Sequence, residues 1–362
     1  MSLSIARVVS SLAKVGDLYR AQGLPPEPSG LAFPVAMVKP MLDRLAEDLT
    51  EDRLRAILRT VVGDPVRLDG PADGWRASGY LKVLHVLPAT PLVGWTSLIS
   101  AVLVKSRSLV KLSRREPYYT AAFLNLLQEA DTELRNWIEI VDSAEDGMND
   151  ADAVVAYGRD ATIERLRGMV KGETPFFAYG SRFSVAIVNQ NAPEDAAARL
   201  ATDVVRLYQS GCLSPAICLT DLPITDRLAE ALDAETKRFP ARPTLGEATA
   251  VRREREAALF DPNRSALGPD DLSWTIIQSR SPQFEAIGAF NLLQVCPLEA
   301  RTVIPWQKVQ AIAVEGIAPD WLAGLSPSRI CRAGEMQMPG LDWPENGRSL
   351  VRDLIRWTAV ER

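Results

Sequence analysis

From residue 80 onward, short apolar segments typical of β-strands alternate with segments of helical periodicity. In the first half of this pattern we predict strands at Tyr80–Leu87, Ser108–Leu112, Trp137–Val141 and Ala153–Tyr157, and helices at Leu92–Lys105 and Tyr118–Ala130. In the second half we predict strands at Ser184–Val188 and Ala216–Thr220, further strands within Asp271–Arg280 and Leu292–Pro297, and helices at Pro193–Gln209 and Ile224–Phe239. Strand–helix–strand order is typical of parallel sheets with helical crossovers, so the sequence predicts an α/β protein.

The regions around this alternation predict further helices and one irregular segment. Before residue 80, apolar spacing predicts an amphipathic helix within Ser2–Arg20 and helices at Leu31–Leu49 and Leu54–Val62. The stretch Phe239–Pro269 is rich in Pro, Arg and Glu, which predicts an irregular surface excursion. A chain of 362 residues exceeds one compact core, so we expect two domains, the second beginning near Phe183.

The composition argues against several functional classes. A net charge of −5 argues against a broad basic surface for nucleic acid. The longest uncharged apolar run, between Thr90 and Lys105, is too short to span a bilayer. The four cysteines include no CxxC pair, which argues against a zinc site and favours reduced thiols in the cytoplasm. The single histidine, His85, excludes mechanisms that need two histidines.

Cys212 is the cysteine whose surroundings suggest chemistry. It follows a predicted helix, in a turn bounded by Gly211 and Pro215. A glycine lets the backbone turn and lets a substrate approach closely, and nearby backbone N–H groups would lower the pKa of a thiol there. On composition alone, a buried packing thiol is the more frequent role for such a cysteine.

The stretch from Tyr179 to Thr220 resembles the catalytic stretch of the aldehyde dehydrogenase superfamily. The order is the same: a glycine turn at Gly180-Ser181-Arg182, a strand, an Asp/Ala-rich helix, and the loop Gln209-Ser210-Gly211-Cys212. Three upstream stretches resemble other motifs of that family, and they occur in the same order along the chain. The motifs are, in turn, the loop beside the reacting carbonyl, the Lys-Pro-Ser motif and the turn near the cofactor phosphates. The stretches are Pro88–Leu92, Val110–Ser113 and Ala156–Arg159.

Within that superfamily, the chain is most similar to the acyl-CoA reductases of the bacterial luminescence (LuxC-like) type. The similarity extends from about residue 80 to the end of the sequence. The stretches that carry it are His85 ahead of Pro88–Pro91, the phrase Gly211–Pro215, and the C-terminal segments Ser328–Met336 and Gly347–Trp357.

The resemblance implies an aldehyde-dehydrogenase-like α/β fold with two Rossmann-like parallel-sheet domains and the active site between them. Residues 1–182 would hold the N-terminal helices and the NADPH-binding domain, 183–322 the catalytic domain, and 323–362 a segment that packs back on both. The implied catalytic residues are Cys212 and Thr90; the cofactor contacts are Lys111, Ser113, Arg114, Gly158, Arg159, Gly180 and Ser181; the substrate contacts are His85, Trp95, Gln209 and Ser214. His85 has a simpler reading as a histidine at the edge of the core.

One residue of the motif indicates the direction of the chemistry. Aldehyde-oxidising members of the superfamily carry a glutamate two residues before the glycine turn, where it activates the water that hydrolyses the acyl-enzyme. This sequence has Ala178 there, and a reductase gains nothing from that base. The resemblance therefore implies attack of Cys212 on an acyl thioester, followed by hydride transfer to give the aldehyde. The backbone N–H of Cys212 is a candidate donor to the oxyanion.

The sequence departs from the family at the second oxyanion donor. The family has an asparagine where this chain has Thr90 or Ala89, depending on the alignment, and only threonine could donate. Arg114 and Arg115 follow Lys111, and guanidinium groups suit a 2′-phosphate, which favours NADPH over NADH; the two arginines would also fit a solvated helix start.

Three functions are compatible with these motifs. They are reduction of acyl-CoA or an acyl-carrier thioester, reduction of an acyl phosphate as in glutamyl-phosphate reductases, and a non-catalytic role in a fatty-acid-activating complex. The resemblance further implies a homo-oligomer and an acyl-activating synthetase as partner. The hairpin through which the fold usually dimerises is not evident in the sequence.

Overall fold

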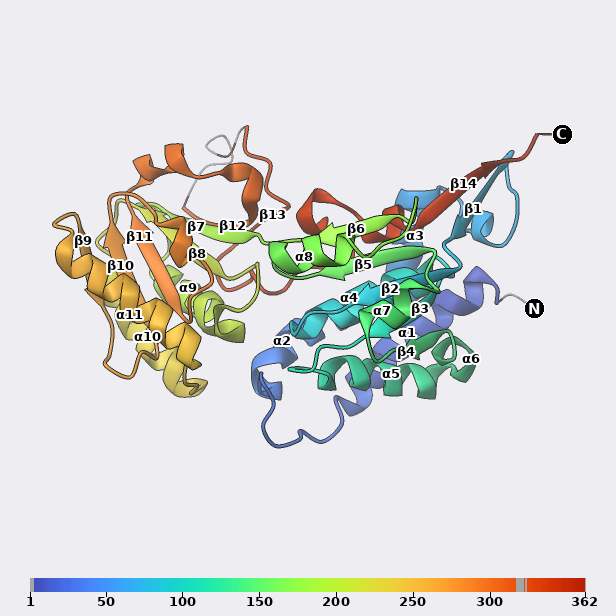
Figure 1. Cartoon of the computed structure of the whole chain (residues 1–362), viewed down its shortest axis with the longest axis horizontal. Helices are drawn as coiled ribbons and strands as arrows, with labels where there is room; N and C mark the ends of the chain where they lie inside the picture. The colour runs from blue at the N-terminus through green and yellow to red at the C-terminus, as the bar shows by residue number, and fades with distance from the viewer. Residues whose placement is uncertain (1–2, 317–321, 323, 362) are drawn as a thin grey trace. The chain divides into compact units, whose positions relative to one another are not determined.

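The computed structural model describes residues 3–316, 322 and 324–361, and the chain divides into two compact units (Figure 1). Unit 1 comprises Met1–Ser181 and Gly340–Arg362, and unit 2 comprises Arg182–Pro339. The C-terminal region that the sequence suggested as one segment, residues 323–362, is therefore shared between the two units. Its predicted start at residue 323 lies outside the described residues.

The described part of unit 1 contains a five-stranded parallel sheet in the order β4-β3-β2-β5-β6. Its strands are β2 (Lys82–Val86), β3 (Arg107–Lys111), β4 (Ile138–Ile140), β5 (Ala153–Tyr157) and β6 (Phe176–Tyr179). The helices after these strands are α4 (Pro91–Leu103), α5 (Tyr118–Ala130), α6 (Thr132–Arg135), α7 (Ala144–Met148) and α8 (Asp160–Arg167). From β2, the chain first adds β3 and β4 on one side of the sheet and then adds β5 and β6 on the other side. The carboxyl ends of β2 and β5 are thus the place where such a sheet binds ligands.

Three N-terminal helices cover part of this unit: α1 (Ile5–Gln22), α2 (Val35–Glu47) and α3 (Glu51–Val62). Thr50 caps α3, since its hydroxyl accepts the N–H of Arg53 at 3.3 Å. Helix α1 is fixed to the end of α5, because Arg7 and Ser11 both donate to the carboxylate of Asp131, at 2.9 and 2.8 Å. The helices that apolar spacing predicted here are confirmed.

A separate two-stranded antiparallel ribbon joins the two chain segments of unit 1. Strand β1 (Trp75–Gly79) pairs with β14 (Ile355–Ala359), after the 3-10 turn Pro65–Leu68 and the short helix α12 (Leu350–Asp353). The ribbon extends away from the sheet of unit 1 (Figure 1). The sequence did not reveal it, because its two strands come from opposite ends of the unit and no turn connects them.

The described part of unit 2 forms a seven-stranded sheet in the order β13-β12-β7-β8-β11-β10-β9, in which β9 is antiparallel and the other strands are parallel. The strands are β7 (Phe183–Val188), β8 (Pro215–Thr220), β9 (Arg264–Leu267), β10 (Thr275–Ser279), β11 (Leu292–Cys296), β12 (Val309–Glu315) and β13 (Arg329–Cys331). The helices are α9 (Ala196–Val205), α10 (Thr225–Arg238) and α11 (Leu245–Phe260). Every residue of β7 and β8 is buried, as expected for central strands that are covered on both faces.

Two predictions about unit 2 are wrong. Phe239–Pro269 is not an irregular excursion: it contains helix α11 and strand β9. Thr244 and Glu247 form a capping box at the start of α11, which outweighs the local abundance of charged residues. The helix predicted over Pro193–Gln209 ends at Val205, and the four residues after it adopt a different conformation.

In the described part of the chain, no helix combines the length and apolar character needed to cross a membrane.

Candidate active site

Cys212 lies in a tight turn immediately before the central strand β8. The N–H of Ser214 donates to the carbonyl of Gly211 at 3.1 Å, so Cys212 and Leu213 are the two middle residues of a β-turn. We call Gly211–Ser214 the nucleophile turn. The carbonyl of Cys212 accepts the hydroxyl of Ser184, from the neighbouring strand β7, at 2.8 Å. The side chain of Cys212 is half-buried, which leaves part of it within reach of a substrate.

The other three cysteines are poor nucleophiles. Burial raises the pKa of Cys218, Cys296 and Cys331 to about 12, so all three remain thiols at neutral pH. The thiolate is the reactive form of cysteine. Among the four cysteines, Cys212 is therefore the remaining candidate for the nucleophile.

The backbone that leads into the nucleophile turn is held in an unfavourable conformation. Leu207, Tyr208 and Gln209 have φ angles of 56°, 49° and 57°, which is the left-handed region. For residues with a side chain this region costs about 1–2 kcal/mol each. Three in succession require strong local contacts to hold them.

Gln209 provides most of these contacts. Its Nε2 donates to the carbonyls of Pro215 and Leu292 at 2.8 Å each, and its Oε1 accepts the N–H of Leu292 at 2.6 Å. The ring of Tyr208 stacks on Phe290, with centroids 5.9 Å apart. The sequence suggested Gln209 as a substrate contact, but its amide is fully occupied by backbone and it is 4% exposed. Its role is to fix the backbone ahead of Cys212.

Ser214 likewise turns inward. It is 3% exposed, and its hydroxyl accepts the side-chain Nε2 of Gln337 at 2.6 Å. The suggested contact of Ser214 with substrate is thus replaced by a contact inside unit 2. Sequence reasoning missed Gln337 and Ser184, which hold the nucleophile turn, because each lies far from Cys212 along the chain.

Two residues that the sequence placed beside the substrate belong to the core of unit 1. His85 in β2 and Trp95 in α4 are both fully buried. Burial lowers the pKa of His85 to about 3, so its ring is neutral, and Nδ1 lies 2.7 Å from the hydroxyl of Ser97. Trp95 donates to the carbonyl of Tyr119 at 2.8 Å. The suggested roles of His85 and Trp95 as substrate contacts are corrected to packing, because neither side chain reaches the surface.

The predicted cofactor loops lie where the strands of unit 1 end. Lys111 is the last residue of β3, and Thr90 and Arg159 directly precede α4 and α8, which follow β2 and β5. The hydroxyl of Ser113 accepts the N–H of Arg115 at 3.3 Å, and the Arg114 side chain is exposed.

The glycine turn of Gly180 and Ser181 packs against the start of α8. The N–H of Ser181 donates to the carboxylate of Asp160 at 2.7 Å, and the N–H of Asp160 donates to the hydroxyl of Ser181 at 3.2 Å. A Cβ on Gly180 would lie 2.8 Å from that carboxylate, and one on Gly158 would lie 3.3 Å from Thr162. Both positions therefore favour glycine.

The residues of this edge fit a dinucleotide in part. Two helices begin at the carboxyl ends of adjacent strands, and helix N-termini attract phosphate groups. Within the described residues, Lys111 and Arg114 take no part in an ion pair, so both cations are available to an anionic ligand. The carboxylate of Asp160, in the first turn of α8, would repel a phosphate at that helix start.

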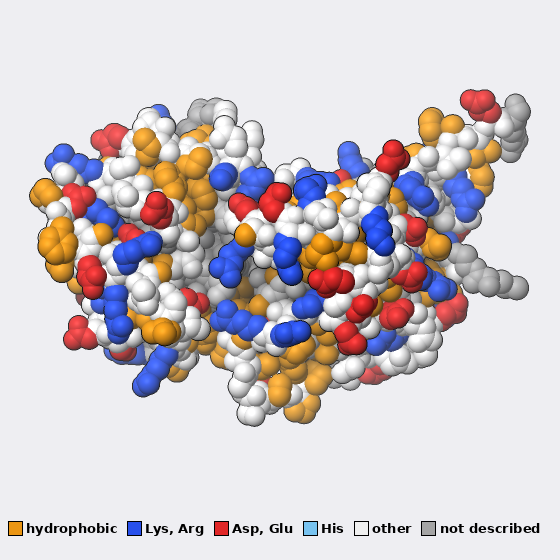
Figure 2. All heavy atoms as spheres, viewed as in Figure 1, with side chains coloured by type: hydrophobic (Ala, Val, Ile, Leu, Met, Phe, Trp, Pro, Cys, Tyr) orange, Lys and Arg blue, Asp and Glu red, His pale blue; other side chains and the backbone are white. Residues whose placement is uncertain are grey.

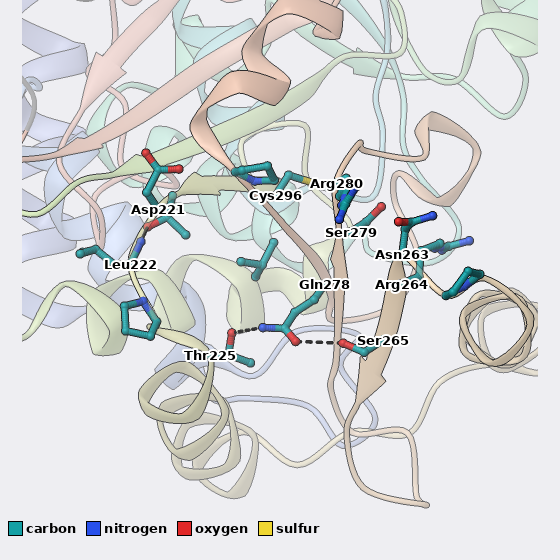
Figure 3. Close-up of a pocket in the computed structure, with 15 residues that line it drawn as sticks. Asp221, Leu222, Thr225, Asn263, Arg264, Ser265, Gln278, Ser279, Arg280 and Cys296 are labelled. Carbon is teal, nitrogen blue, oxygen red and sulfur yellow. Dashed lines mark hydrogen bonds between the residues drawn. The ribbon is translucent and has the colours of Figure 1, made fainter.

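A hollow of about 690 Å³ in unit 2 is separate from the nucleophile turn (Figure 3). It lies beyond the carboxyl ends of β8, β10 and β11, whereas Cys212 precedes the amino end of β8. Gln278 spans its floor, donating to Thr225 at 2.6 Å and accepting from Ser265 at 2.9 Å. None of the residues that the sequence suggested for the active site lines it.

Solved structures with the same fold include aldehyde dehydrogenases. The glyceraldehyde-3-phosphate dehydrogenase GapN of Methanocaldococcus jannaschii, solved with NADP, is 12% identical with a TM-score of 0.71, and the match covers 98% of this chain and 89% of that one. An NAD-dependent aldehyde dehydrogenase of Sinorhizobium meliloti is 14% identical with a TM-score of 0.72, covering 99% and 83%. These likenesses, together with the two α/β units, define a protein of the aldehyde dehydrogenase fold, as the sequence predicted.

Within that class, the chain belongs to the acyl-CoA reductase (LuxC) family, whose model matches residues 5–357. Two curated relatives are each 24% identical to it. The long-chain acyl-protein thioester reductase 2 of Photobacterium leiognathi is matched over 80% of this chain and 68% of the relative. The long-chain acyl-protein thioester reductase of Aliivibrio fischeri is matched over 80% and 67%. Together, the family and fold support a reductase that converts an acyl group to an aldehyde.

Proposed function

We propose that this protein reduces a long-chain acyl thioester to the aldehyde through a covalent acyl intermediate on Cys212. The observation that carries the proposal is the placement of Cys212. It is half-buried in a turn whose backbone is fixed by Ser184 and Ser214, while Cys218 and Cys296 are buried and the pKa of each of the other three cysteines is raised. Membership of the acyl-CoA reductase family supports the same conclusion.

In the proposed reaction, the Cys212 thiolate attacks the carbonyl carbon of the substrate. A new C–S bond forms to Cys212, the bond to the carrier sulfur breaks, and the carrier leaves as a thiolate that takes up a proton. The Gly211–Cys212 peptide is planar, so the N–H of Cys212 points opposite to the Gly211 carbonyl that binds Ser214. We assign this N–H, with the Thr90 hydroxyl, to the developing oxyanion.

The acyl-enzyme has to survive until it is reduced. Ala178, in β6, offers no base that would activate water at the position where oxidising relatives carry glutamate. A reduced nicotinamide, when bound, supplies the hydride that converts the thioester to the aldehyde. Lys111 and Arg114 would hold the adenosine end of that cofactor, and Ser113, Gly158 and Arg159 would line its path. We propose NADPH ahead of NADH because both nearby arginines, Arg114 and Arg115, are exposed and cationic.

The carrier of the acyl group is proposed to be either CoA or a protein thiol. Both curated relatives are named for acyl-protein thioesters, which makes an acylated protein the first carrier to test. An acyl-activating synthetase would supply such a substrate. We also propose a homo-oligomer that forms through the β1–β14 ribbon of unit 1, because this ribbon presents two half-exposed tryptophans, Trp75 and Trp357.

The proposal is tested by following NADPH absorbance with three substrates: a long-chain acyl-CoA, the same acyl group on a carrier protein, and a long-chain acyl phosphate. We expect NADPH consumption and an equal amount of aldehyde with at least one thioester, and none with Cys212→Ala. Cys218→Ala is the matched control and should retain activity, because Cys218 is a buried thiol. Consumption with the acyl phosphate alone would replace the proposed substrate class. No consumption and no acyl adduct with any of the three would favour a non-catalytic role.

A further inference from the structure

We infer that Gln337 is a positioning residue for Cys212, because its buried side-chain amide binds Ser214 at one end of the nucleophile turn and lies next to Gly211 at the other. The inference rests on the proposed function, since it concerns the same thiol. Gln337 is 2% exposed, and its Nε2 donates to the Ser214 hydroxyl at 2.6 Å. At the other end of the turn, a Cβ on Gly211 would lie 3.3 Å from Oε1 and 3.4 Å from Nε2 of Gln337. The amide therefore faces Gly211 and leaves little more than the space of one Cβ between them.

Two buried carboxylates anchor the segment that carries this glutamine. Asp203, in α9, accepts the N–H groups of Gly334 and Met336 at 2.5 and 3.1 Å. Glu315, at the end of β12, accepts the N–H of Ala333 at 2.9 Å. Both carboxylates are at most 3% exposed. These hydrogen bonds satisfy three backbone N–H groups between residues 333 and 336 away from water, so the backbone before Gln337 is held firmly.

A guanidinium group holds the backbone on both sides of the same glutamine. Nη1 of Arg329 donates to the carbonyls of Glu335 and Met336 at 2.9 Å each, and Nη2 donates to that of Met338 at 3.2 Å. Gln337 thus projects from a segment that is fixed by charged side chains before and after it. A side chain anchored in this way can transmit its position to the turn it contacts.

The consequence for catalysis is geometric. Attack on a thioester needs the Cys212 sulfur within about 3–3.5 Å of the carbonyl carbon and correctly aligned, and a misplacement of about 1 Å can cost two orders of magnitude in rate. Without the amide of Gln337, the buried Ser214 hydroxyl loses its donor and Gly211 loses the surface that it packs against. The turn can then shift. Gln337 touches neither substrate nor cofactor in this scheme, so it acts through the position of the turn.

The test compares Gln337→Met and Ser214→Ala with the wild type in single-turnover acylation of Cys212 by a long-chain acyl thioester, without NADPH. Gln337→Met keeps the size of the side chain and removes its hydrogen bonds. We expect each variant to slow acylation about tenfold, because a shifted turn misplaces the Cys212 sulfur relative to the carbonyl carbon. The double variant should be no slower than either single variant, because both remove the same contact. The substrate concentration at half-saturation should change little, since substrate binding is not the step affected.

Gln294→Met is the matched control. Gln294 is a buried glutamine of β11 that exchanges two hydrogen bonds with the backbone of Gln283 and does not touch the turn. It should lower the stability of unit 2 by a similar amount while leaving acylation within about twofold of wild type. Equal slowing by Gln294→Met and Gln337→Met would overturn the inference, because a general loss of stability would then explain both.

A second readout needs no substrate and separates this inference from the proposed function. Amide hydrogen exchange of residues 211–214 should accelerate about tenfold in Gln337→Met and Ser214→Ala, and not in Gln294→Met. If the wild type takes up no acyl group, the proposed function fails, and the exchange rates still decide whether Gln337 holds the turn. Unchanged exchange in Gln337→Met would overturn the positioning role whatever the reaction.

Discussion

At the scale of single residues, the left-handed stretch Leu207–Gln209 is the costliest local feature on the path to Cys212. Its φ angles are those that glycine adopts without cost, yet none of its residues is glycine. The side chains therefore have to stabilise this left-handed conformation, and Gln209 does so through three hydrogen bonds.

Replacing Gln209 separates the stabilisation by its side-chain hydrogen bonds from the conformational cost of its backbone. Gln209→Ala and Gln209→Gly both remove the amide, but only glycine relieves the left-handed backbone. We expect both variants to be less stable than the wild type, and Gln209→Gly to be the more stable of the two by about 1 kcal/mol. Urea unfolding of the two variants measures this difference. Equal stability would mean that the backbone at residue 209 carries no conformational cost.

The carboxyl group of Asp203 gives unit 2 a pH-dependent stability. Burial raises the pKa of Asp203 to about 7, although the N–H groups of Gly334 and Met336 and the charge of Arg206 oppose the shift. Below about pH 4 this group is protonated in both the folded and the unfolded chain. Between about pH 4 and pH 7 the unfolded chain loses the proton and the folded chain keeps it, so the free energy of unfolding falls as pH rises.

Asp203→Asn removes this contribution. We expect the free energy of unfolding of the wild type, relative to that of Asp203→Asn, to fall as the pH rises from about 5 to about 7.5. The fall is about 1.4 kcal/mol for each pH unit over which the folded chain keeps a proton that the unfolded chain has lost. Denaturant midpoints for unit 2 at the two pH values provide the measurement. Parallel pH dependences for the two proteins would contradict a raised pKa at Asp203.

The sequence could locate those residues of the site that lie in short local motifs. Cys212 and Lys111 lie in short motifs whose spacing survives in this chain, so a resemblance could locate them. Their surroundings could not be predicted in the same way. His85 and Trp95 were suggested as substrate contacts because they flank the Pro88–Leu92 loop, which resembles the family's loop beside the reacting carbonyl, yet both side chains are fully buried in unit 1.

At the scale of elements, the strands and helices of the two sheets follow their apolar patterns closely, and α5 and β5 begin and end at the predicted residues. The failures have local physical causes. Helix α11 is rich in arginine and glutamate and shows little amphipathic contrast, so its capping box was the signal that could have identified it. Strands β1 and β14 form an isolated pair without a turn, which no local pattern reveals.

Arg255 is the residue that ties α11 to the sheet of unit 2. Its guanidinium donates to the hydroxyl of Thr275 and to the carbonyls of Pro269 and Trp274, at 2.7–3.0 Å. We expect Arg255→Ala to destabilise unit 2 by about 2–3 kcal/mol, because buried carbonyls lose charged donors. Arg252→Ala, on the exposed side of the same helix, should change stability by less than about 0.5 kcal/mol. Thermal unfolding of the two variants compares them, and equal effects would remove Arg255 from this role.

At the scale of the whole molecule, the chain leaves unit 1 at Ser181, builds unit 2, and returns to unit 1 at Gly340. The returning segment is fixed where the N–H of Leu341 donates to the buried carboxylate of Asp48 at 2.7 Å, and it ends in β14. Unit 1 is therefore complete only after unit 2 has been made. The same returning chain supplies half of the ribbon proposed to join subunits.

The tryptophans of this ribbon test the proposed oligomer. Trp75 and Trp357 are 48% and 46% exposed, and their rings meet edge to face with centroids 6.3 Å apart (Figure 2 shows apolar side chains on this ribbon). We expect Trp75→Lys with Trp357→Lys to convert the assembly to a monomer in light scattering, because charged side chains disfavour a buried contact. Leu245→Lys, at an exposed leucine of unit 2, is the control. A monomeric wild type would contradict the proposal.

The proposed reaction depends on one covalent bond, between the acyl group and Cys212. Intact-protein mass spectrometry, after mixing the protein with a long-chain acyl thioester in the absence of NADPH, measures that bond directly. We predict a mass increase of one acyl group, located by digestion on the peptide that contains Cys212, absent in Cys212→Ala and released as aldehyde when NADPH is added. An acyl group on another residue, or an adduct that persists in Cys212→Ala, would contradict the account.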